Sequence, residues 1–193
     1  MKAARLILVL LAWAGILGHV VSAAGAAPQV TEQEVKAEFL RRIAFYTEWP
    51  ANRFPKEDSP VVIGVVGRSG VAAEVEKLAK KKGTEIKRRR IEARRLNVND
   101  DLSQCHVLFI GAETDYEPLL AKLKNTSVLT VGEHRAFARN GGMVNFVLQE
   151  ESVKFEVNIA VATQAGLRLS SELLDVVRGW KLIVDATPQK RQL

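Results

Sequence analysis

The residue types that most often carry out chemistry are sparse in this 193-residue sequence. It holds three histidines and one cysteine; His106 and His134 stand alone, and His19 falls within an N-terminal apolar segment. A metal site or a nucleophile–base pair needs several such side chains at defined spacing, or a serine within a Gly-x-Ser-x-Gly turn. Neither pattern occurs, so we expect no enzyme activity, no metal and no cofactor.

A glycine-rich stretch, residues 64–70 (GVVGRSG), follows an apolar run and precedes a helix-like pattern. Loops of this kind can bind phosphate, because free amide groups at a helix start attract anions. The glycine spacing matches neither the Rossmann nor the P-loop pattern. We therefore expect a tight turn from strand to helix, with a phosphate or nucleotide site as the alternative.

Three residues are candidates for binding a ligand or a partner: Trp49, Arg53 and Arg168. Trp49 precedes a proline, and Arg53 and Phe54 follow closely. A rigid aromatic ring beside a guanidinium group can recognise rings or carboxylates. The alternative is that Trp49 covers the end of the hydrophobic core, as large aromatic residues often do.

The N-terminus has the order of a secretory signal peptide. Lys2 and Arg5 precede an apolar run over 6–17, and small residues follow over 21–27. This order predicts export to the periplasm with cleavage near residues 23–27. An uncleaved membrane anchor is the alternative, although the apolar run is shorter than the roughly 20 residues that span a bilayer.

Positive charge is concentrated between residues 80 and 95. The chain has 28 basic and 22 acidic residues, and this segment contains KKK at 80–82 and KRRR at 87–90. Clustered cations often bind nucleic acid, but an exported protein meets little of it, so we expect no nucleic-acid partner. We expect a solvated helix end and strand face, with an anionic membrane or an acidic partner as the alternative.

The single cysteine, Cys105, cannot form a disulfide within the chain. It precedes the apolar run 107–110, so we expect a buried, unreactive thiol. Pairing between two chains is the alternative.

Apolar periodicity predicts the order of the elements. A capping box, Thr31 to Glu34, begins a helix that we expect to end near Trp49-Pro50. Strands alternating with helices predict a mainly parallel sheet. The expected strands span 61–67, 85–91, 106–111 and 127–132, and the expected helices span 69–82 and 116–124.

The C-terminal third has a different pattern. Residues 143–148 and 153–157 alternate apolar with polar side chains, which predicts a hairpin. We expect a closing helical region over 158–177, bent near Gly166. The predicted fold class is α/β, a single compact domain over 28–180 with a mainly parallel sheet, flanking helices and a C-terminal antiparallel hairpin. Residues 1–26 form the expected signal peptide and 181–193 a polar tail.

Seven short segments stand in order along the chain: 35–40, 48–50, 63–67, 105–109, 141–146, 153–158 and 166–174. Together they resemble the YfiR family of periplasmic regulatory proteins over about residues 35–177. The resemblance implies a compact domain, often a dimer, without catalytic activity. It also implies repression of a membrane diguanylate cyclase through its periplasmic domain, which lowers cyclic di-GMP, and sequestration of the repressor by an outer-membrane lipoprotein.

The sequence departs from the family in its cysteines. The family's repressor has intrachain disulfides, whereas Cys105 matches one of those cysteines and has no second cysteine to pair with. Redox control by an internal bridge is therefore excluded. We expect a regulatory protein that binds an inner-membrane diguanylate cyclase or sensor kinase. The alternative is a receptor for an aromatic or anionic metabolite, with Trp49, Arg53 and Arg168 lining its pocket.

Overall fold

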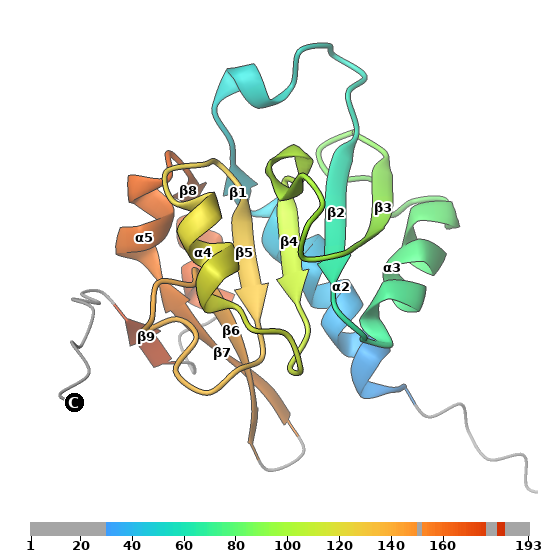
Figure 1. The fold of residues 1–193 in the computed structure, drawn as a ribbon. Helices are drawn as coiled ribbons and strands as arrows, with labels where there is room; N and C mark the ends of the chain where they lie inside the picture. The colour runs from blue at the N-terminus through green and yellow to red at the C-terminus, as the bar shows by residue number, and fades with distance from the viewer. Residues whose placement is uncertain (1–29, 150–151, 177–180, 184–193) are drawn as a thin grey trace, which may run out of the picture.

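A seven-stranded sheet and a separate two-stranded sheet organise the chain in a computed structural model that describes residues 30–149, 152–176 and 181–183 (Figure 1). The helices are α2 (Glu32–Phe45), α3 (Val71–Lys80), α4 (Glu117–Leu123), α5 (Ile159–Gln164) and α6 (Ser171–Val176), with 3-10 turns η1 (Ala51–Arg53) and η2 (Leu102–Gln104). The strands are β1 (Thr47–Glu48), β2 (Val61–Val66), β3 (Ile91–Leu96), β4 (Val107–Ile110), β5 (Leu129–Gly132), β6 (Val144–Gln149), β7 (Ser152–Asn158), β8 (Arg168–Leu169) and β9 (Lys181–Ile183). Within the described ranges, no helix has the length and apolar character needed to cross a membrane.

The large sheet confirms the predicted fold class. Its strand order is β3-β2-β4-β5-β6-β7-β9, with parallel pairs throughout except for the antiparallel hairpin of β6 and β7. Every residue of β2, β4 and β5 is buried, as expected for strands covered on both faces. Side chains of α2, α3, α5 and α6 pack on one face, and those of α4 and η2 pack on the other.

Helix α2 begins as predicted and ends earlier than predicted. Thr31 Oγ1 accepts a hydrogen bond from the Glu34 amide at 3.2 Å, and the Glu34 carboxylate accepts one from the Thr31 amide at 2.7 Å. The end expected near Trp49-Pro50 is wrong, because the helix stops at Phe45. Thr47 instead pairs with Leu169 in the β1–β8 sheet. A contact distant in sequence therefore ends the helix before the proline can.

The predicted basic strand over 85–91 is also wrong. Ile86 and Arg89 exchange two backbone hydrogen bonds of 2.9 Å, and the two residues between them have positive φ, 50° at Lys87 and 68° at Arg88. Positive φ at both central positions is the pattern of a type I′ turn. This turn reverses the chain, so that Ile86 enters the core and the strand begins only at Ile91.

The closing region is broken where a single bent helix was expected. Helix α5 ends in a Schellman motif: Gly166 has φ +77°, its amide donates to Thr163 O, and the Leu167 amide donates to Ala162 O. The chain then forms β8 before α6 begins. The tail expected from residue 181 begins with β9, which pairs with β7; residues 184–193 and the expected signal peptide lie outside the described residues.

Replacing Arg88 by glycine is expected to stabilise the fold by roughly 0.5–1 kcal/mol, because glycine adopts positive φ without the strain of an L side chain. Arg88 is exposed, so little packing is lost. Urea unfolding should show a higher midpoint with an unchanged slope. Arg90→Gly, at a residue without positive φ, is the control and should lower the midpoint. A lower midpoint for Arg88→Gly would contradict the assignment of strain.

Candidate functional site

The structure brings Trp49 and Arg53 together around the buried side chain of His106. The Trp49 indole donates a hydrogen bond to His106 O at 3.3 Å, and the two rings meet edge to face with centroids 5.8 Å apart. The Phe54 ring stacks on His106 at 4.5 Å. Two of the three predicted site residues thus belong to one aromatic cluster, at the start of β4.

The Arg53 side chain donates hydrogen bonds to main-chain carbonyl oxygens. Its guanidinium group donates to Ser103 O at 2.9 Å and to Cys105 O, which fastens η1 to the loop that leads into β4. Its Nε atom is buried and has no hydrogen-bond partner among the described residues. Burial lowers the pKa of Arg53. A guanidinium group bonded in this way positions a loop, and few of its N–H donors remain for a ligand.

His106 is held as a neutral ring. Its Nδ1 accepts a hydrogen bond from the Val62 amide at 3.1 Å, and Nε2 lies 3.1 Å from Arg53 O, to which it can then donate. The residue is only 5% exposed, and burial lowers its pKa to about 4. Both ring nitrogens are occupied, so the geometry assigns His106 a structural role.

The low pKa of His106 predicts a stability loss in acid. Above pH 6.5 the ring is neutral in both the folded and the unfolded chain and contributes no pH dependence. Between pH 6.5 and 4 the His106 ring binds a proton in the unfolded chain but not in the folded chain. The free energy of unfolding should therefore decrease by up to about 3 kcal/mol as the pH is lowered through this range. Urea unfolding across this range measures the loss, and His106→Asn should flatten it. An equal slope in both proteins would contradict this role.

Arg168 makes none of the contacts described for this cluster and lies in β8, which pairs with β1. It faces Glu48 across the β1–β8 pair, with 3.6 Å between the charged groups, and its side chain is 83% exposed. A hollow of about 180 Å³ opens beside Trp49, which is small against the several hundred Å³ of most ligand pockets. Neither Arg53 nor Arg168 lines it. Its lining is Thr47, Glu48, Trp49, Phe54, Val61, Ile86, Lys87 and Arg89.

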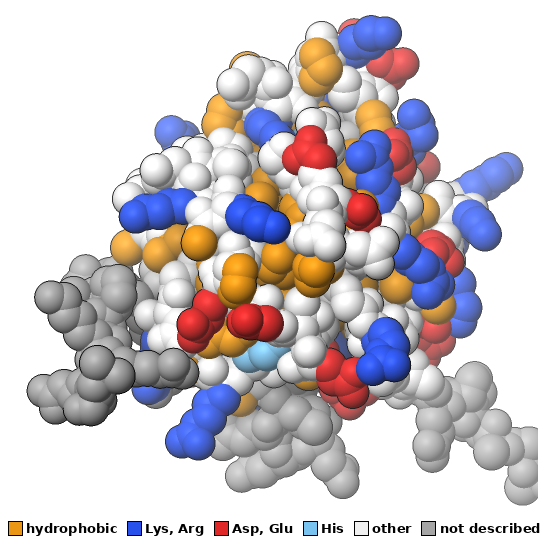
Figure 2. Space-filling view, viewed as in Figure 1, with side chains coloured by type: hydrophobic (Ala, Val, Ile, Leu, Met, Phe, Trp, Pro, Cys, Tyr) orange, Lys and Arg blue, Asp and Glu red, His pale blue; other side chains and the backbone are white. Residues whose placement is uncertain are grey.

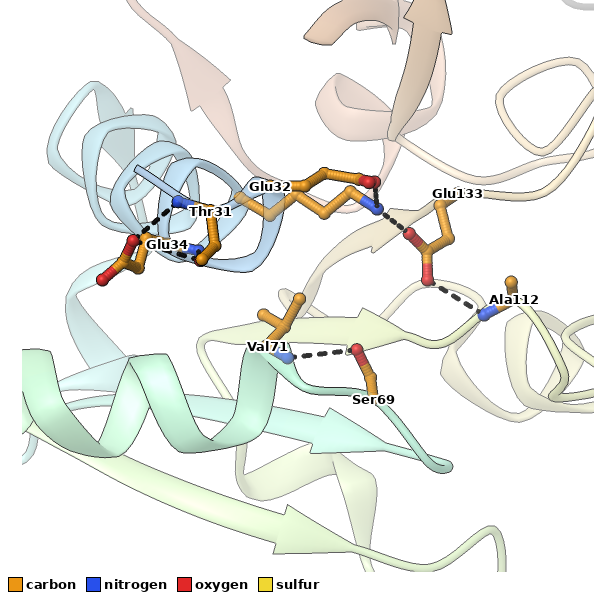
Figure 3. Close-up of polar contacts among 8 residues, drawn as sticks. Thr31, Glu32, Glu34, Ser69, Val71, Ala112 and Glu133 are labelled. Carbon is orange, nitrogen blue, oxygen red and sulfur yellow. Dashed lines mark hydrogen bonds and ion pairs between the residues drawn. The ribbon is translucent and has the colours of Figure 1, made fainter. Parts of the chain in front are cut away.

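The carboxyl edge of the parallel strands is where open α/β sheets usually bind ligands. Here a carboxylate of the protein itself, the Glu133 side chain, lies at that edge (Figure 3). Glu133, just after β5, accepts a hydrogen bond from the Ala112 amide at 3.1 Å and pairs with Lys36 of α2. Lys36 is 9% exposed and also pairs with Glu32. Burial lowers the pKa of Lys36, but bonding to Glu133 and Glu32 outweighs it and leaves the pKa raised.

The glycine loop at the same edge forms the predicted tight turn. Gly67 has φ +85°, and a Cβ there would lie 2.0 Å from Thr114 Oγ1, so both backbone conformation and space require glycine. Ser69 Oγ accepts a hydrogen bond from the Val71 amide at 3.2 Å (Figure 3). This bond satisfies one of the amides that a phosphate would need.

A second hollow, larger than the one beside Trp49, was not predicted from the sequence. It measures about 600 Å³ and lies between α4 and α5. The connection from β5 to β6 consists of turns, so no crossover helix covers this part of the sheet. Hydrophobic side chains come to the surface around α4 (Figure 2). The lining includes Leu120, Leu123, Asn125, Thr130, Asn140, Met143, Val161, Gln164 and Ala165.

Comparison with protein families matches residues 33–178 to the family described as YfiR/HmsC-like. The chain belongs to the YfiR/HmsC-like family. The match extends from α2 through α6 and beyond, and therefore includes the clusters around His106 and Glu133. The family is one of periplasmic regulators and not of catalysts. No curated protein matches the chain.

In this YfiR/HmsC-like protein, exposed aromatic and charged side chains gather at the small sheet. Phe45 is 41% exposed and its ring meets that of Tyr46 at 5.3 Å. The Tyr46 carbonyl accepts a hydrogen bond from the Ser170 amide, which holds this corner against β8. We call this region the β1–β8 surface and define it by Phe45, Tyr46, Glu48, Arg168 and Leu169.

Proposed function

We propose that this protein is exported to the periplasm and acts there by binding, as a repressor of a membrane diguanylate cyclase or a similar sensor. The observation that carries the proposal is the family match over residues 33–178. In this proposal residues 1–26 are the cleaved signal peptide, 28–180 form the binding domain and 181–193 the tail. A homodimer and an outer-membrane lipoprotein are further proposed partners, by analogy with the family.

Repression by binding is a shift between two states of the partner. The protein must bind the inactive state more tightly than the active one, since equal affinity would shift nothing. Moving a partner from mostly active to mostly inactive requires about 5.5 kcal/mol of differential affinity. A contact surface of ordinary size can supply this when it contains a few strongly bound side chains.

The β1–β8 surface is the part of the molecule we propose for this contact. Aromatic and arginine side chains dominate the binding energy of protein interfaces. Here the rings of Phe45 and Tyr46 meet just before β1, and Arg168 lies opposite Glu48 in the strand that pairs with β1. The ion pair of Arg168 with Glu48 is exposed, and such pairs contribute little. The Arg168 guanidinium group can therefore exchange this partner for a carboxylate of another protein.

Deleting the gene should raise cyclic di-GMP, because the cyclase loses its repressor. The native chain should restore the low level, whereas a Phe45→Ala/Arg168→Ala double variant should not. Val98→Ala is the matched control, since Val98 is 43% exposed but lies in the loop after β3. Nucleotide extraction and quantification measure the effect at equal protein levels. Unchanged nucleotide in the deletion strain, or full restoration by the double variant, would overturn the proposal.

A second candidate function is a receptor for a small aromatic or anionic metabolite. The hollow between α4 and α5 supports it, because about 600 Å³ lies within the range of small-molecule pockets. The earlier candidate lining of Trp49, Arg53 and Arg168 stays a prediction, since only Trp49 borders the smaller hollow. Ligand binding and partner binding are compatible in one molecule.

Thermal unfolding with a metabolite panel tests this second function. A ligand at 100 times its Kd should stabilise the fold by about 2.7 kcal/mol. Ala121→Trp, which fills the larger hollow from α4, should abolish the shift, whereas Trp49→Phe should not. The reverse result would place the ligand beside Trp49. Flat curves across the panel would reject the receptor function.

A further inference from the structure

The net charge of the chain is concentrated in one short segment. Residues 80–90 contain seven Lys and Arg residues and one Glu, a net charge of +6. The whole chain also carries +6. The other 182 residues therefore hold 21 basic and 21 acidic residues and have no net charge. A general excess of cations does not explain this segment, because the rest of the chain is balanced.

Cations that flank the segment form ion pairs within the protein, whereas those inside it form none with the residues that the structure describes. Lys77 pairs with Glu74, Arg94 with Glu92, and Arg95 with Glu76, at 2.8, 2.6 and 2.6 Å. Among the described residues, no acidic side chain forms an ion pair with any cation of residues 80–90. The exposed members define what we call the basic surface: Lys80, Lys81, Lys82, Lys87, Arg88 and Arg90.

Two residues of the basic surface lie in a strained backbone conformation, which costs the folded state free energy. Lys87 and Arg88 both have positive φ, in a turn where asparagine and glycine are usual. Strained positions of this kind concentrate where a side chain serves a function beyond the fold. Lysines near the C-terminal end of a helix interact favourably with the helix dipole. This accounts for Lys80 at the end of α3 but not for Arg88 or Arg90.

Neighbouring contacts hold the turn rigidly against the body of the protein. Arg89 donates to three carbonyl oxygens of the loop before β2, those of Lys56, Glu57 and Ser59, and its guanidinium lies 4.2 Å from the centre of the Phe54 ring. Lys87 donates to Thr47 O at 3.0 Å. The turn is thereby fixed, and Arg88 projects into solvent. Lys and Arg side chains extend from the α3 and β3 side of the molecule (Figure 2).

The composition of the basic surface distinguishes between its two possible anionic partners. Protein interfaces are depleted in lysine and centre on buried aromatic or apolar anchors. The segment's one large apolar side chain, Ile86, is 1% exposed and cannot serve as an anchor. An anionic lipid surface needs no anchor, because each nearby Lys or Arg adds attraction independently. We propose that the basic surface docks on anionic phospholipid headgroups, independently of the protein partner.

Vesicle sedimentation tests this docking. The native chain should bind vesicles of phosphatidylcholine mixed with phosphatidylglycerol, and not phosphatidylcholine alone. Neutralising four cations, as Lys81→Gln/Lys82→Gln/Arg88→Gln/Arg90→Gln, should weaken binding roughly 100- to 1,000-fold. Salt at about 1 M should abolish the native binding, because it screens charges beyond about 3 Å.

The matched control removes the same charge elsewhere, at four exposed cations in α4, directly after α4 and in the β5–β6 connection: Lys122→Gln/Lys124→Gln/Arg135→Gln/Arg139→Gln. It should retain vesicle binding. All proteins share one N-terminus, so that segment cannot produce the difference, and circular dichroism confirms that each is folded. Equal loss in both variants, or no native binding to the anionic vesicles, overturns the proposal. Binding to polyglutamate in place of vesicles would assign the surface to an acidic protein instead, and also overturns it.

Discussion

Burial of the three central strands on both faces is the constraint on which the rest of the structure depends. β2, β4 and β5 have no exposed residue, so helices must cover each side of the sheet. Side chains of α2, α3, α5 and α6 cover one face, and those of α4 and η2 cover the other. The β5–β6 connection lacks a helix and covers the sheet with Phe137, which is fully buried. The large hollow lies beside this connection, between α4 and α5.

Polar side chains at both edges of the sheet form hydrogen bonds or ion pairs within the protein, although Arg53 Nε has no partner among the described residues. At one edge His106 and Arg53 bond to main-chain atoms of loops that are distant in sequence. At the other, Glu133 joins Lys36 to the loop after β4. Hydrogen-bonded networks of buried polar groups help to specify one arrangement of a fold.

The elements with a local apolar pattern could be predicted from the sequence, and those formed by distant contacts could not. The run at 61–66 and the alternation in the hairpin indicate their own burial, so the mainly parallel sheet was predictable. The end of α2 depends on Thr47 pairing with Leu169, and no nearby sequence pattern predicts that pairing. The turn at Lys87 and Arg88 was missed because those residues rarely adopt positive φ.

In the candidate site, too, features near in sequence could be predicted and contacts between distant residues could not. Trp49 and Arg53 are near in sequence, and the structure places them in one cluster, but the main-chain carbonyls that hold Arg53 come from residues 50 and more positions away. The Lys36–Glu133 pair joins residues 97 positions apart, and spacing alone cannot reveal such a contact. Phe45 is the last residue of α2, as the predicted helix allowed, and is 41% exposed.

We propose that the protein acts by contact with a membrane protein through the β1–β8 surface. Photo-cross-linking in living cells, with a photoreactive residue at position 45, tests it directly, and position 98 provides the comparison because its exposed fraction is similar. We predict an adduct from position 45 with an inner-membrane protein that carries a cyclase or sensor domain, and none from position 98. Absence of an adduct from position 45, or the same adduct from both positions, would contradict the account.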